Sequence, residues 1–466
     1  MSQYCKTDGD IDSPATQFGP GSSFGLVEQW DEFWLIVWKV ELSERVALGA
    51  PASSVFLRSP FSRAESCLSR EYATCHPSKF GSANRILSAQ PGKKTVPTAN
   101  GIDISTKNMI RHQLNKIALI GDYVPRKCGI ATFTHDVCRA LQKSAMDCLV
   151  VAVNDVPEGY LYPPEVRFEI TEQDLSSYRR AGDFLNFTNA EIVCLPHEFG
   201  IYGGPSGRHI LTLLRRLSLP VVTHFHTVVA EPSADQMRIV KDITRLSTRL
   251  IVMSERGRQM LEEIYAVPAD HIDVIPHGIP DMPFVDPNFY KDQFGVEGKK
   301  VLLTFGLLSP GKGIEHVIRA LPRIVQEFPD VVYIILGATH PNLIRQQGET
   351  YRLSLERLAA ELGVKKHVIF YNRFVELEEL QEFLGAADIY TTPYLHAAQI
   401  TSGTLAYAFG CGKAVISTPY WHAQELLADG RGILVPFGDH QAIARGMFYC
   451  PQTPDQKFRR DKNQSY

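Results

Sequence analysis

Short runs of hydrophobic residues recur along the chain from Lys116 onward, and segments long enough for helices separate them. The runs begin near residues 116, 148, 192, 220, 249 and 272, as in K-I-A-L-I-G and C-L-V-V-A-V. Continuous apolar runs of this length are typical of strands buried on both faces of a sheet. Segments 210–217 and 234–246 are predicted to be helices. Strands that alternate with helices predict a parallel sheet.

A second series of strands follows the polar, proline-containing segment 280–288. Its apolar runs begin near residues 300, 331, 367, 388 and 414. The pattern predicts an α/β protein with two Rossmann-like, doubly wound parallel-sheet domains that face each other across a cleft, spanning residues 114–283 and 284–446. Ligands of such sheets bind beyond the carboxyl ends of the strands, so the functional site is expected there.

Residues 1–113 differ from this pattern. They are rich in Ser, Gly and Pro and show no sustained alternation of strands and helices, so we expect a low-complexity, poorly ordered extension. Its apolar segment Phe33 to Val40 is far shorter than the ~20 residues that cross a bilayer. No integral membrane segment is therefore expected.

Composition excludes some classes of function. The 48 basic and 51 acidic residues give a net charge of −3, which argues against a nucleic-acid partner. Nine cysteines, an odd number, include no C-x-x-C pair, so neither a disulfide framework nor a zinc framework is indicated. A reducing, cytoplasmic location is expected.

The segment F-G-L-L-S-P-G-K-G, from Phe305 to Gly313, combines a strand end with a glycine-rich turn and a lysine. The apolar spacing that follows predicts a helix, which Pro322 should bend or end. A lysine beside free amides at a helix start suits an anion. Gly313 replaces the Mg²⁺-binding hydroxyl of an ATPase phosphate loop, so an ATPase is the weaker reading. A turn that only caps the helix is the structural alternative.

An ordered series of motifs resembles the retaining glycosyltransferases of family four, which have the GT-B architecture of two Rossmann-like domains. The series comprises the P-G-K-G turn, V-I-P-H-G-I at 274–279, A-A-D-I-Y-T-T-P-Y at 386–394, G-C-G-K-A-V-I-S-T at 410–418 and E-L-L-A-D-G-R-G-I-L-V-P-F-G-D at 425–439. The resemblance covers residues 115–446. It implies a nucleotide-diphosphate sugar as co-substrate and neither a metal nor another cofactor.

The resemblance implies that Lys312 pairs with the donor phosphates as they leave. The chain departs from the family pattern at Leu307, where an arginine is usual, and at Gln399 and Tyr407, where the family has two glutamates. Gln399 can still bond sugar hydroxyls, whereas Tyr407 could offer one hydroxyl to the ribose. The residues expected to bind the donor are Gly306, Ser309, Lys312, Arg373, Gln399, Thr401, Ser402, Gly403, Thr404 and Tyr407.

On the amino-terminal side, His226 in T-H-F-H-T matches the family's active-site histidine. The resemblance implies that it bonds the transferred sugar. His224 and His226 could suggest zinc, but no third ligand lies nearby in the sequence, and a core histidine is the bland alternative. Gly129, His197 and Glu198 follow strand ends and are expected on the acceptor side, the last two at the cleft rim.

These features together predict a glycosyltransferase that uses His226 and Lys312 and transfers a sugar, with retention, to a glycan, lipid or small-molecule acceptor. A rival reading is a sugar-nucleotide-binding module without turnover, given the departures from the family pattern. Residues 447–466 read as a polar tail. The closing helices of the GT-B architecture are therefore expected to be absent.

Overall fold

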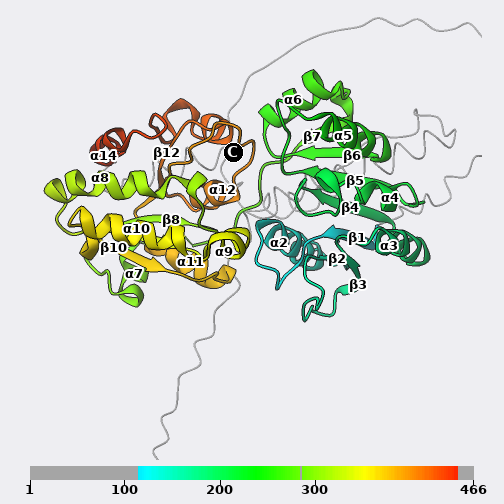
Figure 1. Ribbon diagram of the computed structural model, residues 1–466, viewed down its shortest axis with the longest axis horizontal. Helices are drawn as coiled ribbons and strands as arrows, with labels where there is room; N and C mark the ends of the chain where they lie inside the picture. The colour runs from blue at the N-terminus through cyan, green and yellow to red at the C-terminus, as the bar shows by residue number, and fades with distance from the viewer. Residues whose placement is uncertain (1–113, 284–285, 450–466) are drawn as a thin grey trace, which may run out of the picture. The chain divides into compact units, whose positions relative to one another are not determined.

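Two parallel β-sheets form the framework of the chain. The computed structural model (Figure 1) describes residues 114–283 and 286–449, which belong to one compact unit. The first lobe (residues 114–283) holds a seven-stranded sheet of order β3-β2-β1-β4-β5-β6-β7. Its strands are β1 Lys116–Gly121, β2 Asp147–Asn154, β3 Val166–Thr171, β4 Ile192–His197, β5 Val221–Phe225, β6 Arg249–Val252 and β7 Ile272–Val274.

The second lobe (residues 286–449) holds a six-stranded sheet of order β10-β9-β8-β11-β12-β13. Every strand pair in both sheets is parallel. The predicted fold class, two Rossmann-like parallel-sheet domains, is thus confirmed. The strands are β8 Lys300–Phe305, β9 Val331–Leu336, β10 Val368–Tyr371, β11 Ile389–Thr392, β12 Ala414–Ser417 and β13 Ile433–Leu434.

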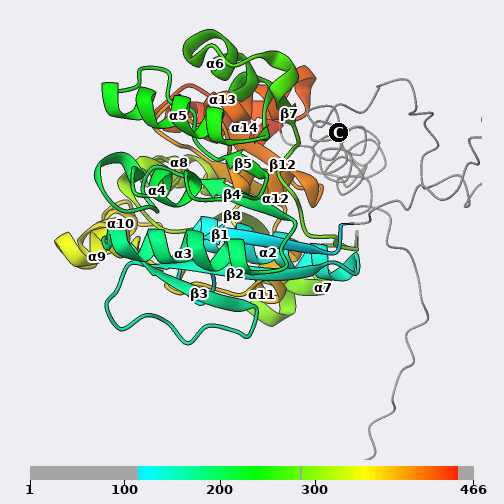
Figure 2. The same cartoon turned by 90° about the vertical axis from the view of Figure 1, so that its right-hand side faces the viewer.

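Helices cover both faces of the first sheet. Along β1, Ala118 and Ile120 join one core cluster while Ile117 and Leu119 join the other, as expected for a strand buried on both faces. The first cluster contains side chains of α3 Leu175–Phe187, α4 Ile210–Leu214, α5 Ala234–Leu246 and α6 Glu255–Tyr265, and the second contains those of α2 Gly129–Lys143. Figure 2 shows α3, α4 and α5 side by side on their face.

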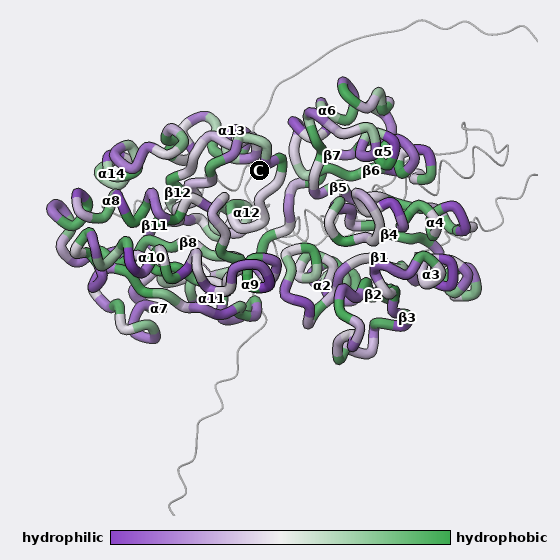
Figure 3. The backbone as a smooth tube through the Cα atoms, viewed as in Figure 1, coloured by the Kyte–Doolittle hydropathy of each residue, from purple (hydrophilic) through white to green (hydrophobic). Residues whose placement is uncertain are grey.

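The second sheet is covered in the same way. One core cluster joins it to α8 Ile314–Glu327, α10 Thr350–Glu361 and α14 His440–Tyr449, and another joins it to α11 Leu377–Ala386, α12 Gly403–Gly410 and α13 Trp421–Leu426. Two shorter helices are α7 Asn288–Lys291 and α9 Pro341–Gln347. Figure 3 shows strands such as β6 and β8 mostly in the hydrophobic colour, whereas hydrophobic and hydrophilic colours alternate along the helices.

Some details differ from the sequence predictions. The helix predicted over 210–217 ends at Leu214. Helix α8 continues through Pro322, which lies within its last two turns. The last described helix, α14, runs to Tyr449, past the predicted domain boundary at 446. The predictions for residues 1–113, and for most of the polar tail, fall outside the described residues.

Candidate active site

Lys312 lies in a tight turn between β8 and α8. The strand ends at Phe305, residues Pro310–Lys312 form a single 3₁₀ turn, and α8 begins at Ile314. Gly313 has φ +64°, and a Cβ there would approach the carbonyl oxygen of Pro393 to 2.1 Å. Only glycine fits this position. The sequence expectation that a glycine turn places Lys312 at the start of a helix is confirmed.

The ammonium of Lys312 is held by Tyr394. Its Nζ donates a 2.6 Å hydrogen bond to the Tyr394 hydroxyl and lies 4.2 Å from the centroid of the same ring. The Tyr394 ring stacks on Tyr420 with a centroid separation of 4.9 Å. Burial by itself raises the pKa of the Tyr394 phenol, but the charge and hydrogen bond of Lys312, together with hydrogen bonds to Thr404 and Ser402, lower that pKa to about 8.

The loop before α12 reaches the same place. The Tyr394 hydroxyl lies 3.1 Å from the Thr404 hydroxyl, so Lys312 and Thr404 share one phenol. Ser402 caps α12 by accepting a bond from the Leu405 amide. The Thr401 hydroxyl is buried without a hydrogen-bond partner among the described residues. The structure therefore brings Lys312 together with the amino terminus of α12, as the sequence predicted.

Gly306 joins this group, since a Cβ on it would lie 3.2 Å from the Thr404 methyl carbon. Ser309 is only partly buried and precedes the lysine turn. Gln399 donates a hydrogen bond from its side-chain amide to the Thr401 carbonyl and so stabilises the loop before α12.

Arg373 does not join this group. It follows the edge strand β10 and forms an ion pair with Glu379 of α11. Nothing in the described residues brings Arg373 to Lys312.

Tyr407 has a different partner from the expected ribose. Its hydroxyl donates a 2.7 Å bond to the carboxylate of Asp136 in α2 of the other lobe. Burial, and then the Asp136 charge, raise the pKa of Tyr407. Tyr407 has 9% of its surface exposed. A bond from this hydroxyl to the ribose was expected; in the structure the phenol bonds a carboxylate that sequence reasoning did not single out.

His226 follows β5 and packs against Phe133 of α2. The two ring centroids lie 4.4 Å apart, and His224 packs on Phe133 at 4.9 Å. The His226 Nε2 is buried with no partner among the described residues. Burial, reinforced by His224, lowers the pKa of His226 well below its ordinary value of 6.5. His226 is therefore a neutral imidazole whose Nε2 has no partner among the described residues.

His197 is buried and not at the rim. Its side chain has 0% exposure, and both ring nitrogens lack partners among the described residues. It packs among Phe199, Tyr202 and Phe225, and burial lowers its pKa to about 3. The expected rim position was wrong because His197 is the last residue of β4, still inside the sheet. Glu198, one residue on, accepts from the Thr227 hydroxyl.

Gly129 is exposed at the first turn of α2, with no atom within 4 Å of a Cβ placed on it. The preceding N-cap residue, Cys128, makes no side-chain capping bond. The amides of Ile130 and Ala131 lie toward the Cys128 thiol and oppose the rise of its pKa that burial causes, while Gly129 leaves open space at the start of α2.

Sequence reasoning missed an ionic group beside α2. Asp122, Asp155 and Glu172 directly follow β1, β2 and β3, and all three approach Arg126 at 2.7, 3.5 and 3.9 Å. Burial raises the pKa of the Asp122 carboxyl to about 7, although Arg126 opposes this shift. For Asp122 and Asp155, an acidic residue shortly after an apolar run was a readable signal, because the carboxyl ends of neighbouring parallel strands lie together.

His277 connects the residues of the two lobes. Its ring lies 5.7 Å from that of Phe133 and 5.7 Å from that of Tyr407. Its Nε2 would be 2.9 Å from a Cβ on Gly403. Its Nδ1 must donate to the Gly278 carbonyl, which leaves Nε2 as an acceptor. A continuous series of contacts therefore runs from Lys312 through the α12 loop and His277 to Phe133 and His226.

The lobes also meet at α6 and α13. The Glu425 carboxylate accepts bonds from the amides of Glu255 and Arg256, in the first turn of α6. Arg256 lies over the Trp421 ring at 5.4 Å, and Ile400 is buried in the core cluster of the first lobe. Glu425 of the second lobe therefore caps the amino terminus of a helix in the first lobe.

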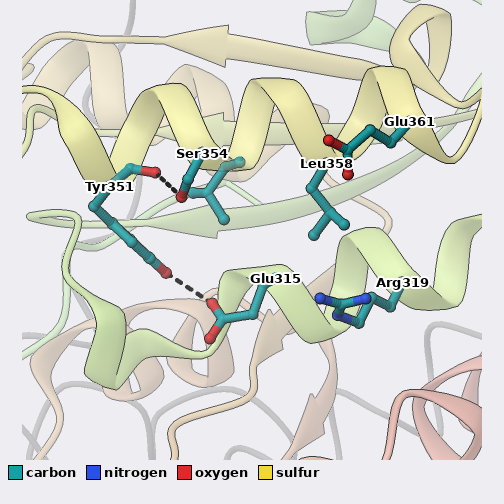
Figure 4. Close-up of a pocket in the computed structure, with 7 residues that line it drawn as sticks. Glu315, Arg319, Tyr351, Ser354, Leu358 and Glu361 are labelled. Atoms are coloured by element: carbon teal, nitrogen blue, oxygen red, sulfur yellow. Dashed lines mark hydrogen bonds between the residues drawn. The ribbon is translucent and has the colours of Figure 1, made fainter.

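A groove of about 320 Å³ lies between α8 and α10 (Figure 4). Figure 4 shows the Tyr351 hydroxyl directed to Glu315, with a 2.9 Å bond. None of the predicted site residues lines this groove.

Within residues 114–283 and 286–449, no group of His, Cys, Asp and Glu side chains could hold a metal ion. In the same residues, no helix is long and apolar enough to cross a membrane.

Two family models match the chain. Residues 128–281 match the model for glycosyltransferase family 4, and residues 287–459 match that for glycosyl transferases group 1. A GDP-mannose-dependent alpha-(1-6)-phosphatidylinositol monomannoside mannosyltransferase of Mycolicibacterium smegmatis is 28% identical over 186 residues, 38% of this chain and 46% of the relative. A phosphatidyl-myo-inositol mannosyltransferase of the same organism is 27% identical over 233 residues, 49% of this chain and 55% of the relative.

The chain thus aligns with about half the length of each relative. Among solved structures, Anabaena Alr3699/HepE in complex with UDP and glucose superposes with a TM-score of 0.57. That match covers 74% of this chain and 91% of the other at 19% identity. At that identity, the likeness concerns the fold.

Proposed function

We propose that this chain, which belongs to the glycosyltransferases of group 1 and family 4, transfers a sugar from a nucleotide-diphosphate sugar to an acceptor hydroxyl with retention of configuration. One observation carries the proposal. The anion-binding elements of the second lobe, Lys312 and the α12 start, connect through His277 to the neutral His226 of the first lobe. A charged leaving group and a sugar can thus be held side by side.

Lys312 would stabilise the departing diphosphate. As the bond from the anomeric carbon to the phosphate oxygen breaks, negative charge grows on that oxygen. The ammonium of Lys312 and the amides at the start of α12 can meet this charge without a metal ion. The acceptor oxygen then bonds to the same face of the anomeric carbon, and its proton passes to the leaving phosphate.

His226 would bind the sugar as a neutral group. Its free Nε2 can hydrogen-bond a sugar hydroxyl, and its lowered pKa keeps positive charge away from the oxocarbenium-like carbon. The exposed α2 start at Gly129 and the Arg126 cluster lie in the first lobe and would serve the acceptor. The acceptor class proposed is a glycan, a lipid or a small polyol.

Relatives suggest which donors to try first. One relative is named as GDP-mannose-dependent, and one structural neighbour binds UDP and glucose. Purified protein should be incubated with UDP-, GDP- and ADP-sugars, and released nucleoside diphosphate should be measured. Release from at least one donor, in water or with acceptor, supports the proposal.

The second candidate function is a sugar-nucleotide-binding module. It is favoured by the commitment of Tyr407 to Asp136 and by Leu307, which cannot contact phosphate through its side chain. Mass spectrometry of nucleotides retained through purification, combined with the donor panel, separates the two. Retained nucleotide with no turnover of any donor would favour the module. An ATPase is opposed by Gly313, and ATP cleavage independent of sugar would revive it.

A further inference from the structure

We propose that Tyr394 is a positioning residue for Lys312. The Tyr394 hydroxyl holds the Lys312 ammonium at the phosphate site until the donor diphosphate binds and replaces the hydroxyl as the partner of that ammonium. This inference rests on the proposed function. Lys312 contacts Tyr394 in two ways, through the 2.6 Å bond to the hydroxyl and through the ring face at 4.2 Å. Two contacts to one side chain fix both the direction and the depth of a long, flexible lysine.

The tyrosine itself is rigid. It is 8% exposed, stacks on Tyr420 at an interplanar angle of 21°, and places its hydroxyl 3.1 Å from that of Thr404. A long lysine side chain loses rotamer freedom when it is fixed in one position. Because Tyr394 has already fixed it, less of this ordering remains to be done when the donor binds.

The same phenol can also bind the donor. A neutral Tyr394 hydroxyl that gives up Lys312 can donate its proton to a phosphate oxygen or a sugar hydroxyl. An ionised Tyr394 cannot do so. It would retain Lys312 as an ion pair and repel the diphosphate, so protonated Tyr394 is the binding-competent form.

The groups around Tyr394 set the pH at which its phenol ionises. Lys312 faces it from the turn at 310–312, Ser402 and Thr404 from the start of α12, Tyr390 from β11, and Tyr420 from the segment before α13. Burial raises the pKa values of Tyr390 and Tyr420, which therefore stay neutral. Burial, and then the positive charge of Lys312, lower the pKa of His340, so this histidine is uncharged at alkaline pH.

The ionisation of Tyr394 sets the direction in which pH changes donor affinity. The phenol pKa of about 8 means that Tyr394 is neutral at pH 7 and largely ionised near pH 9. Donor affinity should therefore fall as pH rises through 8. For a single proton, the dissociation constant should rise about sevenfold between pH 7 and pH 8.8.

The test uses full-length protein with UDP-glucose and GDP-mannose as probes, because their diphosphate diesters do not titrate in this range. Calorimetric dissociation constants are measured from about pH 6.5 to 8.8 for wild type, Tyr394→Phe and Tyr420→Phe. Wild type should lose about sevenfold in affinity across this range. Tyr394→Phe should show a flat profile, while Tyr420→Phe, which removes the adjacent phenol that does not contact Lys312, should keep the wild-type slope.

A tyrosinate titration by near-ultraviolet absorbance provides a second measurement that does not depend on the folding of Tyr394→Phe. Wild type should show one tyrosine that ionises near pH 8, and Lys312→Met should lose that early step. An unchanged slope in Tyr394→Phe, or the absence of any slope in wild type, overturns the inference. If wild type binds neither probe and turns over no donor, the proposed function itself fails.

Discussion

The hydroxyl of Tyr407 in α12 donates a 2.7 Å hydrogen bond to the carboxylate of Asp136 in α2, across 271 residues of sequence. This contact joins the second lobe to the helix whose Phe133 packs against His226. Burial raises the pKa of Asp136, and the Tyr407 bond opposes that rise. The bond therefore compensates part of the unfavourable burial of a carboxylate.

Tyr407→Phe is expected to destabilise the chain. It leaves Asp136 half-buried without its partner, and such losses amount to about 1–3 kcal/mol. Asp136→Asn in the Tyr407→Phe background should recover part of that free energy. Chemical denaturation of the four proteins of this double-mutant cycle measures the coupling. A coupling below about 0.3 kcal/mol would show that the bond does not stabilise the fold.

Gly410→Ala should disrupt the chain segment that crosses between the lobes. A Cβ on Gly410 would lie 2.3 Å from Cδ1 of Ile279, while His277 packs at Gly403, seven positions earlier on the same helix. The expected loss in free energy of unfolding is about 1–3 kcal/mol. Gly200→Ala is the control, because its Cβ would meet no atom within 4 Å. Equal stability of the two variants would contradict this packing.

Acid should destabilise the protein through its buried histidines. Burial lowers the pKa of His197 to about 3, against an ordinary value of 6.5. Between these values the unfolded chain binds the extra proton, so stability is retained above pH 6.5 and lost as pH falls toward 3. One such histidine contributes a slope of about 1.4 kcal/mol per pH unit.

The measurement is denaturation of wild type and His197→Leu between about pH 4.5 and 7.5. The variant should show the shallower pH dependence, whatever its stability at pH 7. A slope identical to that of wild type would mean that His197 is not held neutral in the folded state.

The strand pattern was readable because most strands are continuously apolar. The two missed strands lack that signal. Strand β3, V-R-F-E-I-T, lies at the sheet edge and alternates buried and exposed residues, and β13 has only two residues. Helix α8 tolerates Pro322 because its strongly apolar face, including Val317 and Leu321, is buried in the core.

The site was readable where glycines and the lysine stand together in one turn. Partners distant in sequence were not. The packing of the elements sets two of these contacts, that of Tyr394 with Lys312 and that of Asp136 with Tyr407. No local sequence pattern predicts them. His277 lies in the motif V-I-P-H-G-I, and a histidine at the crossing between two domains is well placed to contact both.

The most direct measurement is donor turnover by Lys312→Met beside the matched control Lys365→Met, which removes an exposed lysine of the same lobe. On the best donor of the panel, Lys312→Met should lose about 100-fold or more in kcat, as expected when a charge that stabilises the leaving group is removed. Lys365→Met should match wild type. Wild-type turnover by Lys312→Met would contradict the assignment of Lys312 to the departing diphosphate.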